Sequence, residues 1–528
     1  MYLAPVFRPL VLAAVLLALG AGSATAGTQH FRVVVVPNLS TADFETLAAR
    51  GAVGLLVPAN GPRTSGVQAL ASLERGEVRN SLLDGGIPPG PPLISVETAS
   101  SPPTVGPAIV VELPPGGDQP NDKRFPIAVL GPGYEGLLTS PSTRLPGVVS
   151  IADVAPTALG EEDGLTSVPQ ADAAARVLEL DDLIGQKKDA RLASGLLVAV
   201  LLLLLALVFP RAALLGYATG LTANLALGAT ETTTLWVVLL AIGLAVAAAI
   251  PLAALLRSPT AVGLALAGVL ALYLVAFLVD ETWVAYSPWG PAQAGRFYGV
   301  TNLLETILLV PALAAATFLA RRFGAVGFLV VAALALILVA GGRFGADGGG
   351  AVVLAAGFGV LALLLWWRLR GPTLAVSLAG GALVVAGALA LGSSHVTDAI
   401  SEGPGELASR LADRLVISWE RATLGPGPAL LTFVSLGVLL ALVVVVLRFD
   451  TPFTRRALPL AVAAAVGTSL LVNDAPNDVA VGGLVAFVVC AAVMLRDRCA
   501  AASCSRSPSA FSWPAAAEKK PSRPQPRP

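Results

Sequence analysis

Residues 192–210 read LASGLLVAVLLLLLALVFP, a stretch of nineteen positions with no charged side chain. A helix needs roughly 20 mainly apolar residues to cross a bilayer, so this stretch indicates a membrane span. Similar runs recur toward the end of the chain, and they predict a polytopic α-helical membrane protein with about 11 spans. The predicted spans are residues 193–209, 212–229, 234–255, 260–279, 302–320, 324–341, 351–367, 372–392, 428–447, 457–473 and 479–495.

The composition of the whole chain agrees with this class of protein. Of its 528 residues, 55% are hydrophobic and 13% are charged, whereas soluble domains average about 45–50% and about 25%. So little polar surface cannot cover a soluble globule of this size. The 34 basic residues are matched by 34 acidic ones, so no net positive field favours a nucleic-acid partner. Membrane lipids are the partners that the composition predicts.

The chain begins with a segment typical of a secretory signal peptide, residues 1–26. Arg8 provides a positive flank, residues 10–21 an apolar core, and Ala24-Thr25-Ala26 a small-residue cleavage site. The apolar core is too short to span a bilayer; an uncleaved anchor is the alternative. Both interpretations place the next segment outside the cytoplasm.

Residues 27–190 are the one segment polar enough to form a small extracytoplasmic α/β domain. Apolar and β-branched runs predict strands, and Ser40 with Asp43 predicts a capping box at the start of a helix. Asp153 is expected to cap a second helix that begins near Pro156. Strands that alternate with helices indicate a sheet covered by helices. The predicted strands are residues 31–36, 52–57, 108–112, 126–130 and 147–151.

Arginines between the predicted spans orient the transmembrane helical bundle, residues 191–496. With the α/β domain outside, the loops expected in the cytoplasm contain most of the arginines, as the positive-inside rule requires. The tail, residues 497–528, is then expected to be a disordered basic segment in the cytoplasm that contacts anionic lipid. The arginines on that side are Arg211, Arg257, Arg321, Arg322, Arg368, Arg370, Arg448, Arg455, Arg456, Arg496 and Arg498.

One long outer loop, residues 393–427, contains an amphipathic pattern. Leu407, Leu411, Leu415 and Trp419 recur every four residues, which predicts a helix with one apolar face. We expect this helix to lie in the outer membrane interface with Trp419 as its anchor. A lid over a substrate site is the alternative.

Cysteine and histidine are too few and too scattered for several kinds of chemistry. Cys490, Cys499 and Cys504 lie in or after the last predicted span. His30 and His395 have no His or Cys neighbour at ligand spacing, which argues against a zinc site. The chain has no Walker-type Gly-Lys-Ser/Thr sequence, so nothing indicates ATP-driven work. No cofactor is predicted.

Three polar motifs stand beside predicted spans on the outer side of the bundle. They define a candidate outer-leaflet pocket of Arg296, Tyr298, Asn302, Glu305, Arg343, Asp347, Asn473 and Asp474. A charged residue at the centre of a span costs about 2.5–3.5 kcal/mol on insertion scales. Glu305, the deepest of the set, is therefore expected to face a cavity or a partner.

Local pattern refines this pocket. On a helix, Tyr298, Asn302 and Glu305 would share one face. The three glycines at 348–350 would let backbone amides approach an anionic group closely. The alternative is that Glu305 forms a structural ion pair, and that the loop residues are simply solvated.

Part of the α/β segment resembles the C-terminal part of alkaline-phosphatase and sulfatase domains. The resemblance rests on residues 131–134 (GPGY), 136–140 (GLLTS) and 143–157 (TRLPGVVSIADVAPT). Active members of that superfamily have a Thr, Ser or modified Cys nucleophile beside Asp and His clusters that hold two metals. This segment has His30 alone and none of the expected Asp-His spacings. The resemblance therefore implies a degenerate, non-catalytic phosphatase-like domain.

The polar motifs are also similar to those of uncharacterised bacterial multi-pass envelope proteins. The similar stretches are 296–299 (RFYG) with Asn302, 345–349 (GADGG) and 473–474 (ND). In that group a phosphatase-like exported domain precedes a membrane bundle. The resemblance implies a protein of the bacterial plasma membrane with this architecture, and it implies no activity.

Three functions are compatible with these features. We favour transport, or the handling of an envelope lipid or glycan at the outer leaflet, in a pocket near Glu305. The second is a transferase that moves a phospho- or glycosyl group from a lipid-linked donor, which metal dependence would favour. The third is an envelope scaffold, which would be insensitive to neutralisation of Glu305 and Asp347.

Overall fold

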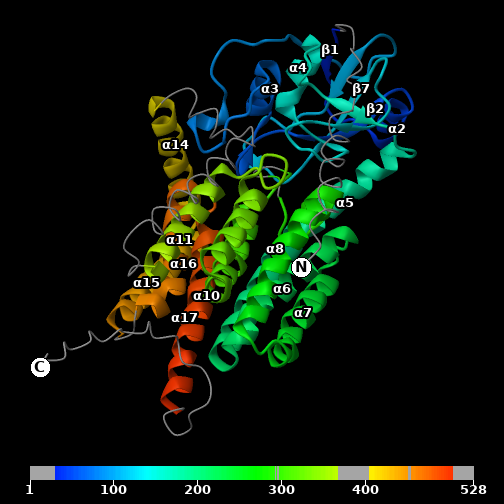
Figure 1. The fold of residues 1–528 in the computed structure, drawn as a ribbon. Helices are drawn as coiled ribbons and strands as arrows, with labels where there is room; N and C mark the ends of the chain where they lie inside the picture. Colours follow the sequence, from blue (N-terminus) through cyan, green and yellow to red (C-terminus); the bar gives the residue numbers. More distant parts are fainter. Residues whose placement is uncertain (1–29, 292, 294–296, 367–403, 450–452, 504–528) are drawn as a thin grey trace, which may run out of the picture.

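The computed structural model describes residues 30–291, 293, 297–366, 404–449 and 453–503. Figure 1 shows an N-terminal sheet domain on one end of a helical bundle. We call the bundle end next to the sheet the domain-side end and the opposite end the far end. The predicted signal peptide and the predicted span at 372–392 lie outside the described residues.

The sheet domain is built around one mixed sheet with the strand order β10-β8-β2-β7-β5-β1-β4, and β9 pairs with β2. β1 is parallel to β4 and β5, whereas β7 is antiparallel to β2 and β5, with Ile109 opposite Val129. All five predicted strands are present. The strands are β1 (Arg32–Val35), β2 (Ala52–Val57), β4 (Val96–Thr98), β5 (Ala108–Val111), β7 (Phe125–Leu130), β8 (Gly136–Thr139), β9 (Val148–Ser150) and β10 (Thr166–Val168), and β3 (Arg63–Thr64) pairs separately with β6 (Gln119–Pro120).

Helices cover both faces of this sheet. α2 (Thr41–Ala48) and the start of α5 (Ala173–Val208) pack on one face, while α3 (Gly66–Arg75) and α4 (Val154–Leu159) pack on the other. The short helical turn η1 (Asp84–Gly86) lies in the loop after α3. Each face of the sheet therefore has its own buried apolar core.

Two capping predictions had different outcomes. The capping box at Ser40 and Asp43 is confirmed, with both reciprocal hydrogen bonds present. The prediction that the Asp153 side chain caps α4 is wrong. The turn η2 (Ile151–Asp153) precedes α4, so the backbone of Asp153 is already helical, and its carboxylate instead accepts a hydrogen bond of 2.8 Å from Ser142.

Among the described residues, eight helices are long and apolar enough to cross a membrane. They are α5, α6 (Pro210–Ala229), α7 (Leu235–Leu255), α8 (Pro259–Val279), α10 (Asn302–Ala340), α11 (Gly348–Trp366), α15 (Pro426–Arg448) and α17 (Pro476–Ser503). The apolar part of α16 (Phe453–Val472) is shorter. The predicted total of about 11 spans is not confirmed.

α10 contains two of the predicted spans, joined at Gly324. This glycine has φ 62° and ψ −145°, a conformation that side-chain-bearing residues rarely adopt. Just before α10 begins, the Val300 N–H donates a hydrogen bond of 3.1 Å to the Gly345 carbonyl, just after it ends. Both ends therefore lie together, and α10 is a helical hairpin that reverses at Gly324.

α5 crosses the predicted domain boundary at residue 190 without a break. Its Val177 and Leu180 belong to the core of the sheet domain, whereas Val198 and Leu202 belong to the core of the bundle. The sheet domain therefore continues directly into the first long apolar helix, as Figure 1 shows.

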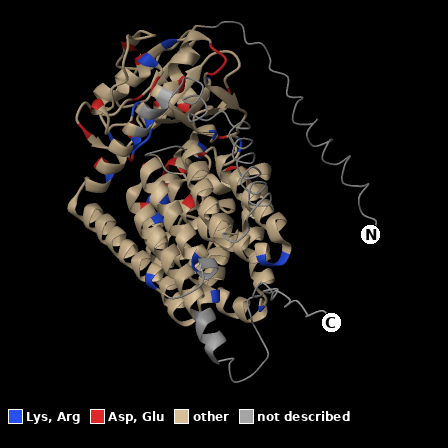
Figure 2. Ribbon diagram, turned by 60° about the vertical axis from the view of Figure 1, so that its left-hand side comes forward, with Lys and Arg blue, Asp and Glu red and all other residues tan. Residues whose placement is uncertain are grey.

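The two ends of the bundle differ in charge. Figure 2 shows both acidic and basic residues in the sheet domain and at the domain-side end, whereas the charged residues visible at the far end are basic. Arg211 donates a 3.5 Å hydrogen bond to the Arg257 carbonyl, and Arg321 and Arg322 lie at the α10 reversal. This distribution is the one that the positive-inside rule associates with a cytoplasmic far end.

A junction segment, residues 280–301, lies between the sheet domain and the bundle. Its short helix α9 (Thr282–Tyr286) is followed by a loop. Tyr286 and Phe297 belong to the sheet-domain core, whereas Trp289 and Val300 belong to the bundle core. The junction segment therefore contributes buried side chains to both parts.

Candidate functional site

The two loop motifs predicted to form the pocket, around residues 298 and 345, contact each other at the domain-side end. Gly299 has φ 79°, and a Cβ added to it would stand 2.1 Å from the Gly345 carbonyl oxygen. Only glycine is compatible with that conformation and that close approach. The contact positions the start of α10, which Thr301 caps by accepting a hydrogen bond of 3.2 Å from the Leu304 N–H.

Glu305 is buried in the first turns of α10, with 1% of its surface exposed. Its Oε2 accepts a hydrogen bond of 2.8 Å from Asn473 Nδ2, which also donates to Ser469 Oγ at 2.8 Å. Asn473 is 1% exposed as well, and its Oδ1 has no hydrogen-bond partner among the described residues. The structure thus brings two of the predicted pocket residues into direct contact. Buried carboxylates within membrane bundles are rare and usually functional.

Asp347 lies beside this pair and caps α11. The Gly350 N–H donates to Asp347 Oδ1 at 3.2 Å, and a Cβ added to Gly349 would stand 3.4 Å from that oxygen and 2.5 Å from Asn473 Oδ1. The anionic group that the glycine run contacts is therefore Asp347 itself. Gly349 therefore lies between Asp347 and the side chain of Asn473. We call Glu305, Asp347, Ser469 and Asn473 the polar cluster.

Asn302 and Asp474 form a second contact next to the polar cluster. Asn302 Nδ2 donates to Asp474 Oδ1 at 2.8 Å, and an Arg421 nitrogen lies 3.7 Å from Asp474 Oδ2. Burial opposes ionisation of Asp474, but Arg421 and Arg414 outweigh it and hold the pKa of this carboxyl below its usual value. The contact with Arg421 joins α14 to the loop between α16 and α17.

α14 (Pro404–Thr423) is the amphipathic helix predicted in the loop 393–427. Trp419 is 62% exposed and its ring meets that of Phe433 edge to face, while Ile417 and Ala422 are buried. An exposed tryptophan at this end of the bundle is what an interfacial anchor requires. The side chains of Leu407 and Leu411 lie outside the described residues.

The remaining predicted pocket residues are placed differently. Tyr298 precedes the helix, so it does not share a helical face with Asn302 and Glu305; its ring instead lies 4.1 Å from the Arg144 guanidinium of the sheet domain. That prediction was wrong because Gly299 and the Thr301 cap delay the start of α10. Arg343 is exposed. Arg296 lies outside the described residues.

Arg144 and Arg343 also act on a carboxyl of the junction segment. Burial raises the pKa of Glu281 above its usual value, Arg144 and Arg343 oppose this rise, and Asp280 adds to it. Arg144 additionally donates a hydrogen bond of 2.8 Å to the Gly342 carbonyl. One arginine of the sheet domain therefore contacts both loops that border the polar cluster.

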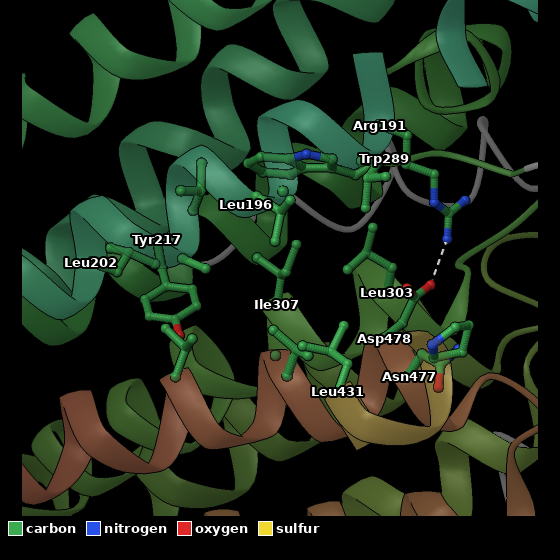
Figure 3. A pocket seen from close by; sticks show the side chains of 18 of the residues that line it. Arg191, Leu196, Leu202, Tyr217, Trp289, Leu303, Ile307, Leu431, Asn477 and Asp478 are labelled. Carbon is green, nitrogen blue, oxygen red and sulfur yellow. Dashed lines mark hydrogen bonds and ion pairs between the residues drawn. The ribbon is translucent and has the colours of Figure 1, made fainter. Parts of the chain in front are cut away.

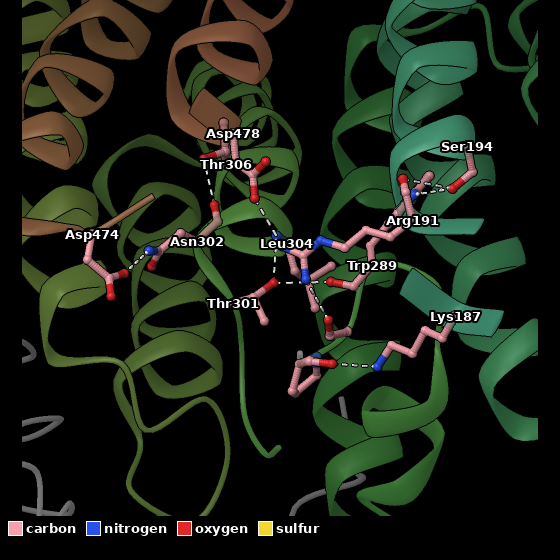
Figure 4. A network of polar contacts seen from close by, with 12 residues as sticks. Lys187, Arg191, Ser194, Trp289, Thr301, Asn302, Leu304, Thr306, Asp474 and Asp478 are labelled. Carbon is pink, nitrogen blue, oxygen red and sulfur yellow. Dashed lines mark hydrogen bonds and ion pairs between the residues drawn. The ribbon is translucent and has the colours of Figure 1, made fainter. Parts of the chain in front are cut away.

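A basic group at the start of the first apolar helix was not predicted to form part of a site. Arg191 donates to Asp478 of α17 at 3.0 Å and to the Gly290 carbonyl at 3.1 Å. Lys187 donates to the Ala285 and Pro291 carbonyls, and Trp289 donates to Ser194 at 3.0 Å. Figure 4 shows the contacts of Arg191 and Lys187 around the junction segment. The signal in the sequence was three basic residues within five positions, Lys187, Lys188 and Arg191, directly before the first long apolar run.

A cavity of about 430 Å³ lies below Arg191, between α5, α10, α15 and α17. Its walls are mainly leucine, isoleucine, valine and alanine side chains. Figure 3 shows the Arg191–Asp478 ion pair at one end and Leu202 and Tyr217 at the other. We call this space the lateral cavity. Its volume falls in the range of about 300–1,000 Å³ that is usual for ligand sites.

Neither the polar cluster nor the lateral cavity has the ligand residues of a metal centre. Among the described residues, no three His, Cys, Asp or Glu side chains come close enough to hold a metal ion. In the sheet domain, the buried Asp153 carboxylate accepts a hydrogen bond from Ser142. Burial raises the pKa of Asp153, although hydrogen bonds with Ser140 and Ser142 oppose the rise. These contacts all join neighbouring turns of the sheet domain.

Comparisons of this chain with protein-family models, with curated proteins and with solved structures find no match.

Proposed function

We propose that this protein binds an envelope lipid or glycan at the outer leaflet of a bacterial plasma membrane and transports or presents it without catalysis. The observation that carries the proposal is the position of the polar cluster. Glu305 accepts a hydrogen bond from Asn473, and both Asn473 and Asp347 lie beside Gly349, at the domain-side end of a bundle whose other buried side chains are mainly apolar. Such residues in spans generally mark substrate or ion pathways.

The proposed orientation follows from charge. The arginines at the far end (Figure 2) favour a cytoplasmic far end, which places the sheet domain and the polar cluster outside. The signal-peptide pattern of residues 1–26 agrees with an exported sheet domain. The polar cluster would then lie in the outer leaflet, where lipid-linked envelope precursors are available.

The phosphatase-like sheet domain takes a non-catalytic part in this proposal. Arg144 of the sheet domain donates a hydrogen bond to the Gly342 carbonyl of the bundle. Two ion pairs also join the sheet domain to α5, one between Asp122 and Lys188 and the other between Arg124 and Asp181. A domain held by contacts of this kind would cover the polar cluster and limit which molecules reach it. The role that we assign to it is therefore selection of substrate.

The test is an envelope lipid and glycan profile of a deletion strain. The strain is complemented with wild type, with Glu305→Gln/Asp347→Asn, or with Asp182→Asn/Asp189→Asn, which makes the same charge change at exposed positions of α5. Expression and melting temperature are matched first. We expect wild type and the control to restore the profile and the cluster variant to fail.

The other outcomes contradict the proposal in identifiable ways. Equal restoration by all three proteins would show that the polar cluster is structural, and would favour a scaffold. A transfer product that wild type forms and that disappears with a chelator would favour the lipid-linked transferase. In the expected outcome, the species that accumulates in the deletion strain identifies the substrate.

A further inference from the structure

We infer that the lateral cavity holds one hydrocarbon chain of an anionic lipid, with the lipid phosphate at Lys188 and Arg191. The inference goes beyond the proposed function: it adds a lipid-binding site outside the polar cluster, and it names a phosphate-bearing lipid as the substrate class. Figure 3 shows the arrangement on which it depends, with charged side chains at one end of an apolar space.

The depth of the lateral cavity matches one leaflet. Its lining extends along α5 from Arg191 to Leu202, eleven residues, or about 16 Å at 1.5 Å per residue. The hydrocarbon core of a bilayer is about 30 Å thick, so one leaflet accounts for about 15 Å. A chain with its phosphate beside Arg191 would therefore end near Leu202 and Tyr217, at the floor of the cavity.

The side of the lateral cavity is open to hydrocarbon. Leu192 and Leu196 of α5 and Leu431 of α15 line it, yet they are 69%, 48% and 45% exposed. A lipid chain can therefore enter from the leaflet without passing through water. Moving a chain from lipid into an apolar cavity brings little hydrophobic gain, so selectivity must come from the headgroup.

The mouth provides donors suited to a phosphate. Arg191 uses one hydrogen bond to Asp478 and one to the Gly290 carbonyl, out of five guanidinium N–H groups. Lys188 is mostly exposed and pairs with Asp122 at 2.9 Å, a surface pair of the kind worth about 0–1 kcal/mol. Its ammonium can exchange Asp122 for a phosphate at little cost. Asn477 also lines the cavity. Its side-chain oxygen accepts a hydrogen bond from Thr432, and its amide N–H₂ is the group that would donate to a ligand.

The lateral cavity and the polar cluster are separate. Leu303 and Ile307 of α10 face the cavity, whereas Asn302 and Glu305 face the polar contacts. Thr306 lies between them in the helical projection, and its Cγ2 would be 2.9 Å from a Cβ added to Gly482 of α17. The lipid site can therefore be altered without a change in the cluster.

The experiment is native mass spectrometry of the full-length protein in detergent, titrated with phosphatidylglycerol or phosphatidylcholine. We expect phosphatidylglycerol to bind at least about tenfold more tightly, a difference of about 1.4 kcal/mol. Gly195→Leu should remove most of that binding, since a Cβ at Gly195 meets nothing within 4 Å and the new side chain fills the cavity. Gly268→Leu is the matched control, because it is also open but lies on α8, outside the cavity.

Two charge variants make the test independent of folding. Arg191→Gln should reduce phosphatidylglycerol binding to the level of phosphatidylcholine. Asp478→Asn breaks the same ion pair but should preserve or strengthen binding, because it removes the competing carboxylate. If both variants lost binding equally, the pair would be structural and the headgroup assignment wrong.

Other results would overturn the inference. Unchanged lipid binding by Gly195→Leu would show that the chain lies elsewhere, and displacement of phosphatidylglycerol by millimolar inorganic phosphate would indicate a site for free phosphate. If the lipid predictions hold but the cluster variant restores the envelope profile, the proposed function fails and this inference stands. If the profile depends on Glu305 and Asp347 while Gly195→Leu binds lipid normally, the proposed function stands and the substrate class is wrong.

Discussion

The polar cluster and the lateral cavity lie on different faces of α10, and they differ in packing: the helices are in close contact at the cluster and leave a space at the cavity. In the cluster, Glu305 and Asn473 are buried and hydrogen-bonded, and the helices close tightly around them. Beside the cavity, α5 has Gly195, and leucines that line it remain exposed. The comparison shows that hydrogen bonds between polar side chains hold the helices together at the polar cluster. At Gly195 no side chain fills the gap between helices, and the lateral cavity remains.

We expect the largest loss of stability from disrupting the contact between the two loops beside the polar cluster, at Gly299 and Gly345. Gly299→Ala places a Cβ 2.1 Å from the Gly345 carbonyl oxygen at a positive φ, so we expect a loss of about 3 kcal/mol or more in the free energy of unfolding. Thermal unfolding in detergent measures it. Gly268→Ala has open space and should change little. Similar melting of the two variants would mean that the loops are loosely packed.

Asn473 tests the centre of the polar cluster. Asn473→Ala removes hydrogen bonds to Glu305 and Ser469, a loss of about 1–3 kcal/mol for buried groups. Asn473→Asp should cost more, because it places a second carboxylate beside Glu305. The extra loss should shrink at low pH, where one proton can be shared. Thr468→Ala, one residue from Ser469, is the control; an Asp variant as stable as the Ala variant at pH 8 would contradict the arrangement.

The contact between Thr306 of α10 and Gly482 of α17 separates the two regions, and we expect its disruption to cause a smaller loss of stability. Gly482→Ala would place its Cβ 2.9 Å from Thr306 Cγ2, and we expect a loss of about 1 kcal/mol from overpacking. Thr306→Ser removes that methyl group and keeps the hydroxyl that donates to the Asn302 carbonyl. The double variant should therefore recover stability. A double-mutant cycle in detergent measures this coupling, and purely additive losses would show that the two helices are not in contact here.

The smallest effect concerns Asp474 at the edge of the polar side. Its pKa is lowered, so its ionised form stabilises the fold above the unfolded pKa of about 3.9, and this contribution is lost as the pH falls through the lower folded value. Asp474→Asn should therefore be less stable than wild type by on the order of 1 kcal/mol from pH 8 to pH 5. The two proteins should converge below about pH 4. A difference that widened in acid would reverse the assigned sign.

Much of the fold could be predicted from local sequence. The strand at 52–57 is a continuous apolar run, and the pair of spans at 302–320 and 324–341 was separated at Arg321 and Arg322, where α10 does reverse. The unbroken α5 could not be predicted in the same way. The composition of α5 changes from polar to apolar at position 191, which predicts a domain boundary there. The helix contains no proline, however, and its backbone continues through this position without a break.

The site was predicted in part, for a physical reason. Glu305, Asp347 and Asn473 stand near ends of apolar runs on one side of the bundle, so topology alone brings them close. The lateral cavity depends on Gly195, Gly482 and the pairing of Arg191 with Asp478, which is 287 residues away. A cavity arises where side chains are small and helices diverge, and no local pattern reports the spacing between helices.

The continuity of α5 has a mechanical consequence. Its 36 residues extend about 54 Å at 1.5 Å per residue, nearly twice the roughly 30 Å of hydrocarbon that a span must cross. The excess length packs on the sheet, with Val177, Leu180 and Ile184 in the core of the sheet domain, so one continuous helix joins the sheet rigidly to the first long apolar segment. Because helices tilt to match bilayer thickness, a thinner or thicker membrane would change the tilt of the sheet together with that of α5, and lipid composition would then affect the sheet domain.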